Sequence, residues 1–245
     1  MSPLKALHCP GNEFKWVDIA GCEACEDRCL PIEIVRWIWK AQFVDDQDHY
    51  HADPSVLSVT ETMRGSCLRK AWYERKRDYA ETPQALMART SGTAIHKSLE
   101  QANTDGCSEV ALKSYISVYA DGWVLRGTAD RLTDEYVGDY KCVDAVRKTY
   151  DERHAEQLNI YNQMAGGGRE MRLWQVARKK VATHVVHEIE DALDVCLDRC
   201  RELIVALEKD DVTMLPPEGK FINFFRAKMC DFCPHKAECW AMDDD

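Results

Sequence analysis

The two stretches that decide the fold read WVLRGTADRL (residues 123–132) and YVGDYKCV (residues 136–143). Both are rich in apolar and β-branched residues, and the polar turn at 133–135 separates them, which predicts a β-hairpin. Alternate side chains of a strand share a face, so Asp139 and Lys141 are expected to project together. Taken alone, this pair is equally well interpreted as a structural ion pair.

A second carboxylate, Asp130, favours a catalytic interpretation because it lies on the neighbouring strand of the hairpin. Gly127 allows another group to approach the backbone closely. Two adjacent carboxylates repel one another unless a cation lies between them, and Mg²⁺ or Mn²⁺ suits oxygen ligands. The metal would polarise a phosphate and lower the pKa of a bound water, while Lys141 would stabilise the developing charge. The hairpin therefore predicts metal-dependent phosphodiester hydrolysis.

Two helices are expected to add polar groups to this site. A helix from Gly92 to about Gln101 places His96 one turn before Glu100, and a helix over 151–164, ended by three glycines, places Gln157 one turn before Tyr161. A hydrogen-bonded helix histidine and an ordinary amphipathic helix are the simpler interpretations. In a nuclease, His96 would add a nitrogen ligand to the metal, and the other pair would hold a phosphate or the metal-bound water.

The remaining elements are predicted from helix caps, breakers and periodicity. Ser58 and Glu61 fit a capping box. Helices are expected over about 32–43, 67–79 and 191–208, with polar loops at 45–54 and 81–84 and strands at 172–177 and 183–189. The expected domains are a cysteine-rich knuckle (1–30), a helix and linker (31–55), and a nuclease domain (56–245).

Four short motifs together resemble the RecB-like branch of the PD-(D/E)XK nucleases. They are GTAIH (92–96), GTAD (127–130), DYK (139–141) and QLNIY (157–161). The segment from SVT at 58–60 to CLRKAWY at 67–73 resembles the entry to the iron–sulfur members of that branch. These members include the CRISPR-associated RecB-like exonucleases, similar phage enzymes and the nuclease domain of AddB. The resemblance covers about residues 56–240. Asp139 departs from it mildly, since many relatives carry Glu there.

The resemblance implies an α/β restriction-endonuclease-like core, a mixed sheet flanked by helices, with a helical lead-in and cysteine-ligated metal sites at both ends. It implies a DNA exonuclease that uses Mg²⁺ or Mn²⁺, acts at DNA ends, prefers single strands and serves recombination, repair or CRISPR adaptation. An iron–sulfur DNA-end binding or adaptor protein with a vestigial nuclease site is the alternative, and a zinc-ribbon-type interaction protein is a third. The implied catalytic set is His96, Asp130, Asp139 and Lys141, supported by Gln157 and Tyr161.

The chain has twelve cysteines, and its C-terminal group is Cys230, Cys233 and Cys239. In a reducing compartment such a cluster indicates metal ligands rather than disulfides, and its spacing permits zinc or an iron–sulfur cluster. The resemblance adds Cys67 as the fourth ligand of a structural [4Fe–4S] cluster. Such ligation would join two distant segments and constrain the unfolded chain.

A second group near the N-terminus consists of Cys9, Cys22, Cys25 and Cys29. Four thiolates suit tetrahedral Zn²⁺, which would fold a segment expected to have no core of its own. A second iron–sulfur cluster, or His8 in place of Cys9, is the competing interpretation. Structural roles are expected for Cys107, Cys142, Cys196 and Cys200.

Composition is that of a soluble globular enzyme, with 45% hydrophobic and 30% charged residues in 245. The chain lacks an apolar run of about 18 residues and a secretory signal, which predicts a cytoplasmic protein of a bacterial cell or phage-infected host and no membrane partner. A net charge of −10 implies that DNA binding relies on local basic patches. The candidates are Arg64, Arg69, Lys70, Arg75, Lys76 and Arg77, and then Arg178, Lys179 and Lys180.

Overall fold

A computed structural model describes residues 4–9, 15–26, 29–44, 53–102, 108–115, 122–218, 230–231 and 233–242. The chain divides into two compact units. The first comprises residues 1–54, 72–93 and 217–245, and the second comprises residues 55–71 and 94–216. The chain passes between the units within two helices, α4 (Leu68–Lys76) and α5 (Pro83–Ala102). The division at residues 30 and 55 stays a prediction.

The second unit contains a mixed sheet with strand order β3-β6-β7-β8-β9. A sixth strand, β5, also pairs with β6. Two pairings, β3 with β6 and β7 with β8, are parallel, and the others are antiparallel. The predicted hairpin and the strand at 172–177 are present, but the strand expected over 183–189 begins earlier and ends at Val185. The strands are β3 (Val56–Ser58), β5 (Ser108–Tyr115), β6 (Val124–Leu132), β7 (Tyr136–Cys142), β8 (Glu170–Ala177) and β9 (Lys180–Val185).

The two strands of the hairpin pair only next to their turn. Arg131 pairs with Gly138 and Leu132 pairs with Val137, and the printed register of β6 with β7 stops there. Beyond this point β6 continues to pair with β5, while β7 pairs with β8 along its whole length. Asp130 and Asp139 are the next residues on each strand, so the carboxylates lie where the strands separate.

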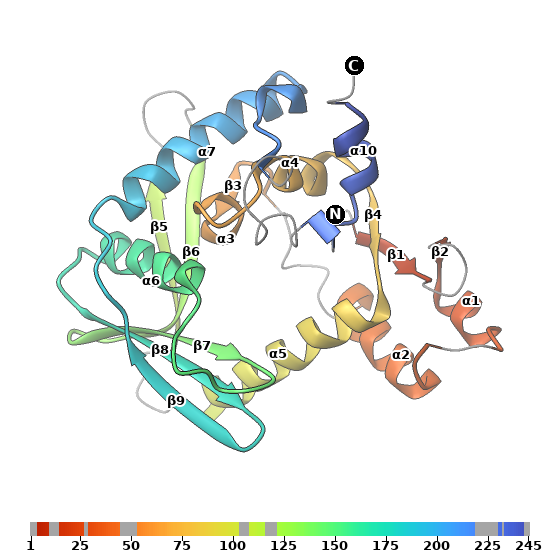
Figure 1. The fold of residues 1–245 in the computed structure, drawn as a ribbon, viewed down its shortest axis with the longest axis horizontal. Helices are drawn as coiled ribbons and strands as arrows, with labels where there is room; N and C mark the ends of the chain where they lie inside the picture. Colours follow the sequence, from red (N-terminus) through yellow and green to blue (C-terminus); the bar gives the residue numbers. More distant parts are fainter. Residues whose placement is uncertain are drawn as a thin grey trace. The chain divides into compact units, whose positions relative to one another are not determined.

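Helices cover one face of this sheet (Figure 1). The helix α6 (Glu152–Met164) packs against several strands, and α7 (Ala192–Glu208) packs against α6. The short α3 (Val59–Thr62) carries the predicted capping box, and the 3₁₀ turn η2 (Val212–Met214) follows α7. Three glycines after α6 all have positive φ, which ends the helix as predicted. A sheet flanked by helices is therefore confirmed. Its fully buried residues include Leu125, Val137, Leu158, Ile160, Leu173 and Leu203.

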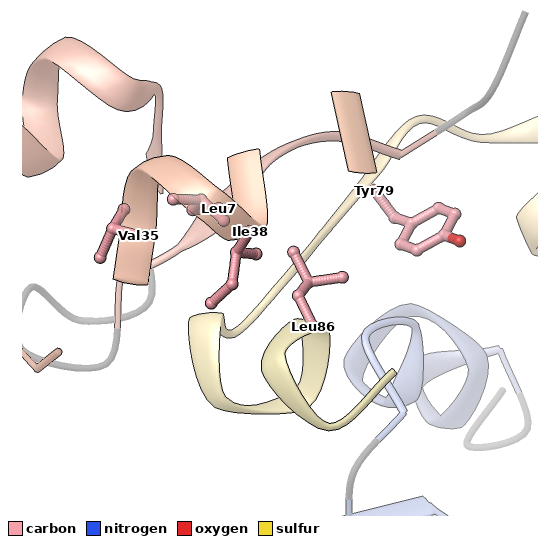
Figure 2. Packing of buried hydrophobic residues seen from close by; sticks show 5 residues of the cluster. All are labelled: Leu7, Val35, Ile38, Tyr79 and Leu86. Atoms are coloured by element: carbon pink, nitrogen blue, oxygen red, sulfur yellow. The ribbon is translucent and has the colours of Figure 1, made fainter. Parts of the chain in front are cut away.

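The first unit has its own small core, formed by Leu7, Val35, Ile38, Tyr79 and Leu86 (Figure 2). Of these five residues, only Leu7 comes from the N-terminal cysteine-rich segment, so the segment shares a core with the rest of the unit rather than forming one of its own. The unit's sheet has the order β2-β1-β4. Its elements are β1 (Leu4–His8), β2 (Trp16–Val17), α1 (Ile19–Glu23), α2 (Ile32–Trp39), the π-helix η1 (Lys40–Val44), β4 (Tyr79–Glu81) and α10 (Lys236–Ala241).

Two predicted boundaries differ from the structure. The loop expected at 81–84 is instead the end of β4 and the start of α5, which begins at Pro83 rather than near Gly92. Proline suits the first turn of a helix because its missing N–H has no helical partner there. The helix expected over 67–79 ends at Lys76. In the described part of the chain, no helix is long and apolar enough to span a membrane.

Candidate active site

The two acids of the hairpin lie in the second unit and are almost fully buried, with 8% of Asp130 and 3% of Asp139 exposed. The backbone N–H of Tyr140 donates to Asp130 Oδ2 at 2.5 Å. The Lys141 ammonium lies 2.7 Å from Asp139 Oδ2, so these two side chains project together. Burial raises the pKa of Asp139, opposed by Lys141 and reinforced by the charge of Asp130. The structure thus brings two carboxylates and one amine together.

His96 joins this group from α5. Its Nδ1 lies 3.1 Å from Asp130 Oδ1. This hydrogen bond raises the pKa of His96 above its ordinary value, against the opposing effect of burial. Glu100, one turn further along the helix, is exposed. Of this helical pair, only His96 is placed beside the acids.

Gln157 and Tyr161 extend the group along α6. Lys141 Nζ donates to Gln157 Oε1 at 2.8 Å, and Gln157 Nε2 donates to the Tyr161 hydroxyl at 2.7 Å. Both α6 side chains are buried. Burial and the charge of Asp139 raise the pKa of Tyr161, which keeps its hydroxyl protonated. The lysine is therefore held between an acid on its own strand and an amide on the covering helix.

His154 is a member of this site that the sequence analysis missed. It lies three residues before Gln157 on α6, so the two share a helix face. Burial and the nearby Lys141 ammonium lower the pKa of His154 to about 4, so the imidazole is neutral at physiological pH. The i, i+3, i+7 spacing of 154, 157 and 161 is the sequence signal that could have identified it.

Gln175 is a second missed residue, and it anchors the loop that follows Lys141. It pairs in register with Lys141 on the adjacent strand β8 and is buried. Its Oε1 accepts from the Arg147 N–H at 2.8 Å, and its Nε2 donates to the Thr149 carbonyl at 3.1 Å. No local sequence signal exists for this residue because its role depends on strand register.

The donor set fits a divalent cation by its chemistry. It combines two buried carboxylates with an imidazole, and apart from the Lys141 ammonium beside it Asp139 Oδ2 accepts no hydrogen bond among the described residues. In the described ranges, however, no group of three or more His, Cys, Asp or Glu side chains is arranged to hold a metal ion. Each carboxylate is instead paired with a neighbouring side chain, Asp130 with His96 and Asp139 with Lys141.

The cysteines expected to bind metals are divided between the units. Burial raises the pKa of Cys22 to about 11, and the neighbouring thiols of Cys29, Cys9 and Cys25 add to that shift. The four N-terminal thiols are therefore close enough to interact. Cys67 belongs to the second unit, whereas Cys230, Cys233 and Cys239 belong to the first.

The remaining cysteines fit the structural roles expected for them, except Cys107, which lies outside the described residues. Cys196 and Cys200 are buried on α7, and Cys196 Sγ lies 3.3 Å from Thr62 Oγ1. Cys142 is half-buried at the end of β7.

Two members of the first basic stretch make contacts within the protein. Arg69 is buried, and its Nε donates to the Leu215 carbonyl at 2.7 Å, so it anchors the chain internally. Arg64 pairs with Asp191 at 2.6 Å. By contrast, the side chains of the second basic stretch, residues 178–180, are all exposed.

A family model and one solved structure agree with this architecture. A family model described as the PD-(D/E)XK nuclease superfamily matches residues 57–240. The crystal structure of SSO0001 overlays with a TM-score of 0.57 at 17% identity, over 83% of this chain and 95% of that one. At this identity the likeness concerns the fold alone. The crystal structure of an alkaline exonuclease (LHK-Exo) from Laribacter hongkongensis overlays with a TM-score of 0.42 at 12% identity, over 64% and 89% of the two chains. No curated protein matches the sequence.

Proposed function

Because the chain belongs to the PD-(D/E)XK nuclease superfamily, we propose that it is a divalent-metal-dependent DNA exonuclease that hydrolyses phosphodiester bonds at DNA ends. The observation that carries the proposal is the buried contact of Asp139 with Lys141 beside Asp130. The preference for ends and for single strands rests on the resemblance of the four motifs to RecB-like nucleases.

Each residue of the site has a distinct role in this proposal. Asp130, Asp139 and His96 would hold Mg²⁺ or Mn²⁺, which supplies Lewis acidity and lowers the pKa of a bound water. Lys141 donates to the scissile phosphate and stabilises its developing charge. Gln157 and Tyr161 hold the ammonium in position through the hydrogen bonds described above. The neutral imidazole of His154 adds no positive charge that would compete with the cation.

The cysteines would hold structural metals in the same proposal. Cys67, Cys230, Cys233 and Cys239 would ligate a [4Fe–4S] cluster, which the resemblance supports. The N-terminal group of Cys9, Cys22, Cys25 and Cys29 would bind Zn²⁺. The spacing of these four cysteines in the sequence supports this second site, since four thiolates suit tetrahedral Zn²⁺.

The decisive experiment compares Lys141→Ala with the parent on end-labelled single- and double-stranded DNA in Mn²⁺. Removing one positioned donor to developing charge typically lowers turnover by about 10²–10³-fold, and we expect a loss of that size. Lys209→Ala, at the C-terminal end of α7, is the matched control and should keep full activity. Equal degradation by Lys141→Ala and the parent would remove Lys141 from the mechanism.

Circular single-stranded DNA tests the requirement for ends. An exonuclease leaves the circle intact and degrades the same sequence once it is linearised. A parent protein that binds DNA ends in Mn²⁺ but hydrolyses neither form would instead favour the adaptor with a vestigial site.

A further inference from the structure

One face of the sheet in the second unit carries exposed and half-exposed side chains among the described residues. Along β7 and β8, the alternate residues that include Val137 and Leu173 are buried beneath α6. The intervening residues point to the other face and are half-exposed, and β9 places exposed side chains there, with Val181 and Val185 each 63% exposed. We call this surface the aromatic face, defined by Tyr136, Tyr140, Arg172, Trp174, Val181, Thr183 and Val185.

Three rings form a continuous row on the aromatic face. The rings of Tyr140 and Trp174 stack with centroids 4.8 Å apart, and Tyr136 meets Trp174 edge-on at 5.9 Å. Trp174 lies over Gly138, where a Cβ atom would come within 2.1 Å of the indole. The Arg172 guanidinium lies 4.2 Å from the centroid of the Tyr136 ring and is ion-paired with Glu170. This packing holds the rings in a fixed arrangement.

The row begins at the candidate active site. Tyr140 follows Asp139 in the chain, and its N–H is the donor to Asp130. Its ring meets His96 edge-on at 6.3 Å. The aromatic face therefore ends beside Asp130 and His96, whereas Asp139 and Lys141 project to the opposite face of β7, toward α6.

The charges beside the aromatic face are complementary to a nucleic acid. The exposed side chains of Arg178, Lys179 and Lys180 lie where β8 turns into β9. Because β7 and β8 run parallel and Cys142 pairs with Val176, this turn lies at the same end of the sheet as Lys141. Three adjacent exposed cations are notable in a chain of net charge −10, and they offer phosphates a local partner.

We propose that the aromatic face binds the single-stranded segment of the nucleic-acid substrate. Bases stack on Tyr136, Tyr140 and Trp174, while the basic turn of Arg178, Lys179 and Lys180 neutralises phosphates. Stacking on aromatic side chains tolerates any sequence because every base has a π-face, and a base is available for stacking only when it is unpaired. This inference rests on the proposed function. It gives a structural cause for the proposed preference for single-stranded DNA.

The first test places negative charge on the aromatic face at its most exposed positions. The double variant Val181→Asp/Val185→Asp should bind a labelled oligothymidine at least about tenfold more weakly than the parent, measured by fluorescence anisotropy in EDTA, where no cleavage occurs. Met214→Asp introduces one such charge at an exposed apolar residue elsewhere in the unit and should bind as the parent does. Unchanged affinity in the double variant would overturn the proposal. So would a change from dimer to monomer in sedimentation without any change in DNA affinity, because the face would then join two copies of the chain.

The second test separates stacking from charge. The parent should bind a base-bearing strand about 5- to 100-fold more tightly than an abasic strand of equal length. Tyr136→Ala should reduce that ratio and Tyr136→Phe should preserve it, whereas general misfolding would weaken both strands alike. A parent that hydrolyses DNA but binds both strands equally well would retain its proposed function and refute the proposal that bases stack on the aromatic face. A parent that discriminates through Tyr136 but hydrolyses nothing supports the face and refutes the nuclease.

Discussion

Gly127 shows how a single hydrogen atom in place of a side chain permits the candidate site to form. A Cβ at this position would lie 2.4 Å from Cε1 of the Tyr161 ring. The ring can lie against β6 only because this residue is glycine, and the Tyr161 hydroxyl then receives the hydrogen bond from Gln157. The sequence indicates that something approaches Gly127 closely, but the identity of the approaching ring follows from how α6 packs on the sheet.

We therefore expect Gly127→Ala to displace Tyr161 and disturb the contacts of Lys141. Overpacking of this kind costs about 1–3 kcal/mol of folding free energy, and hydrolysis should fall as well. Gly92→Ala is the matched control, because nothing lies within 4 Å of a Cβ added there. In the interior of α5 that change should stabilise by about 0.5–1 kcal/mol. Urea denaturation and turnover on linear DNA check both variants, and a Gly127→Ala protein as stable and active as the parent would contradict the role given to this contact.

Among the elements, α6 organises the site because one of its faces carries His154, Gln157 and Tyr161. Its first turn is fixed by Asp151, which accepts from the Arg153 N–H at 3.0 Å and pairs with the Arg153 side chain. An oxygen acceptor at the N-cap satisfies a backbone donor that has no partner within the helix. The position of the polar face along the sheet therefore depends on a cap six residues before Gln157.

Asp151→Ala should destabilise the protein by about 0.5–2 kcal/mol, the usual cost of losing an N-cap. The hydrogen bond from the Arg153 side chain lowers the pKa of Asp151 from 3.8 to about 2. A depressed pKa means that this stabilisation is complete above pH 3.8 and is lost as the pH falls through about 2. Urea midpoints between pH 5 and 2 should thus fall less steeply for Asp151→Asn than for the parent. Asp144→Asn, at an exposed loop position, should follow the parent curve, and identical curves for all three proteins would disprove the assignment.

At the scale of the whole molecule, the chain interleaves its two units, so distant segments fold together. The first unit takes residues from both ends of the chain and from the middle. Its small core combines Leu7, Ile38 and Tyr79, which belong to different elements. Zinc ligation by Cys9, Cys22, Cys25 and Cys29 would add links within this unit, and such links stabilise most where the hydrophobic core is small.

Metal analysis of the anaerobically purified protein tests this organisation. We expect both iron and zinc, with the brown colour of an iron–sulfur cluster. Cys22→Ser should lose zinc and keep iron, whereas Cys233→Ser should lose iron and the colour and keep zinc. Cys142→Ser, which changes a half-buried cysteine on β7, should retain both metals. Unaltered metal content in the first two variants would refute the proposed ligand sets.

The sequence alone determined the features that depend on near neighbours in the chain. These are the hairpin, the shared face of Asp139 and Lys141, the capping box at Ser58, the glycine stop after α6, and membership of the PD-(D/E)XK nuclease superfamily. Each follows from the period of a strand or helix or from a local hydrogen bond, and so it can be read within a few residues.

Only the tertiary structure decided which distant residues meet. His96 on helix α5 reaches Asp130 on strand β6, Gln175 lies beside Lys141, and Trp174 stacks on Tyr140 through the register of β7 with β8. The strands β3 and β5, the early start of α5 and the burial of Arg69 were missed for the same reason. Strand register and helix packing minimise the free energy of the whole core, and no local stretch of sequence encodes that balance.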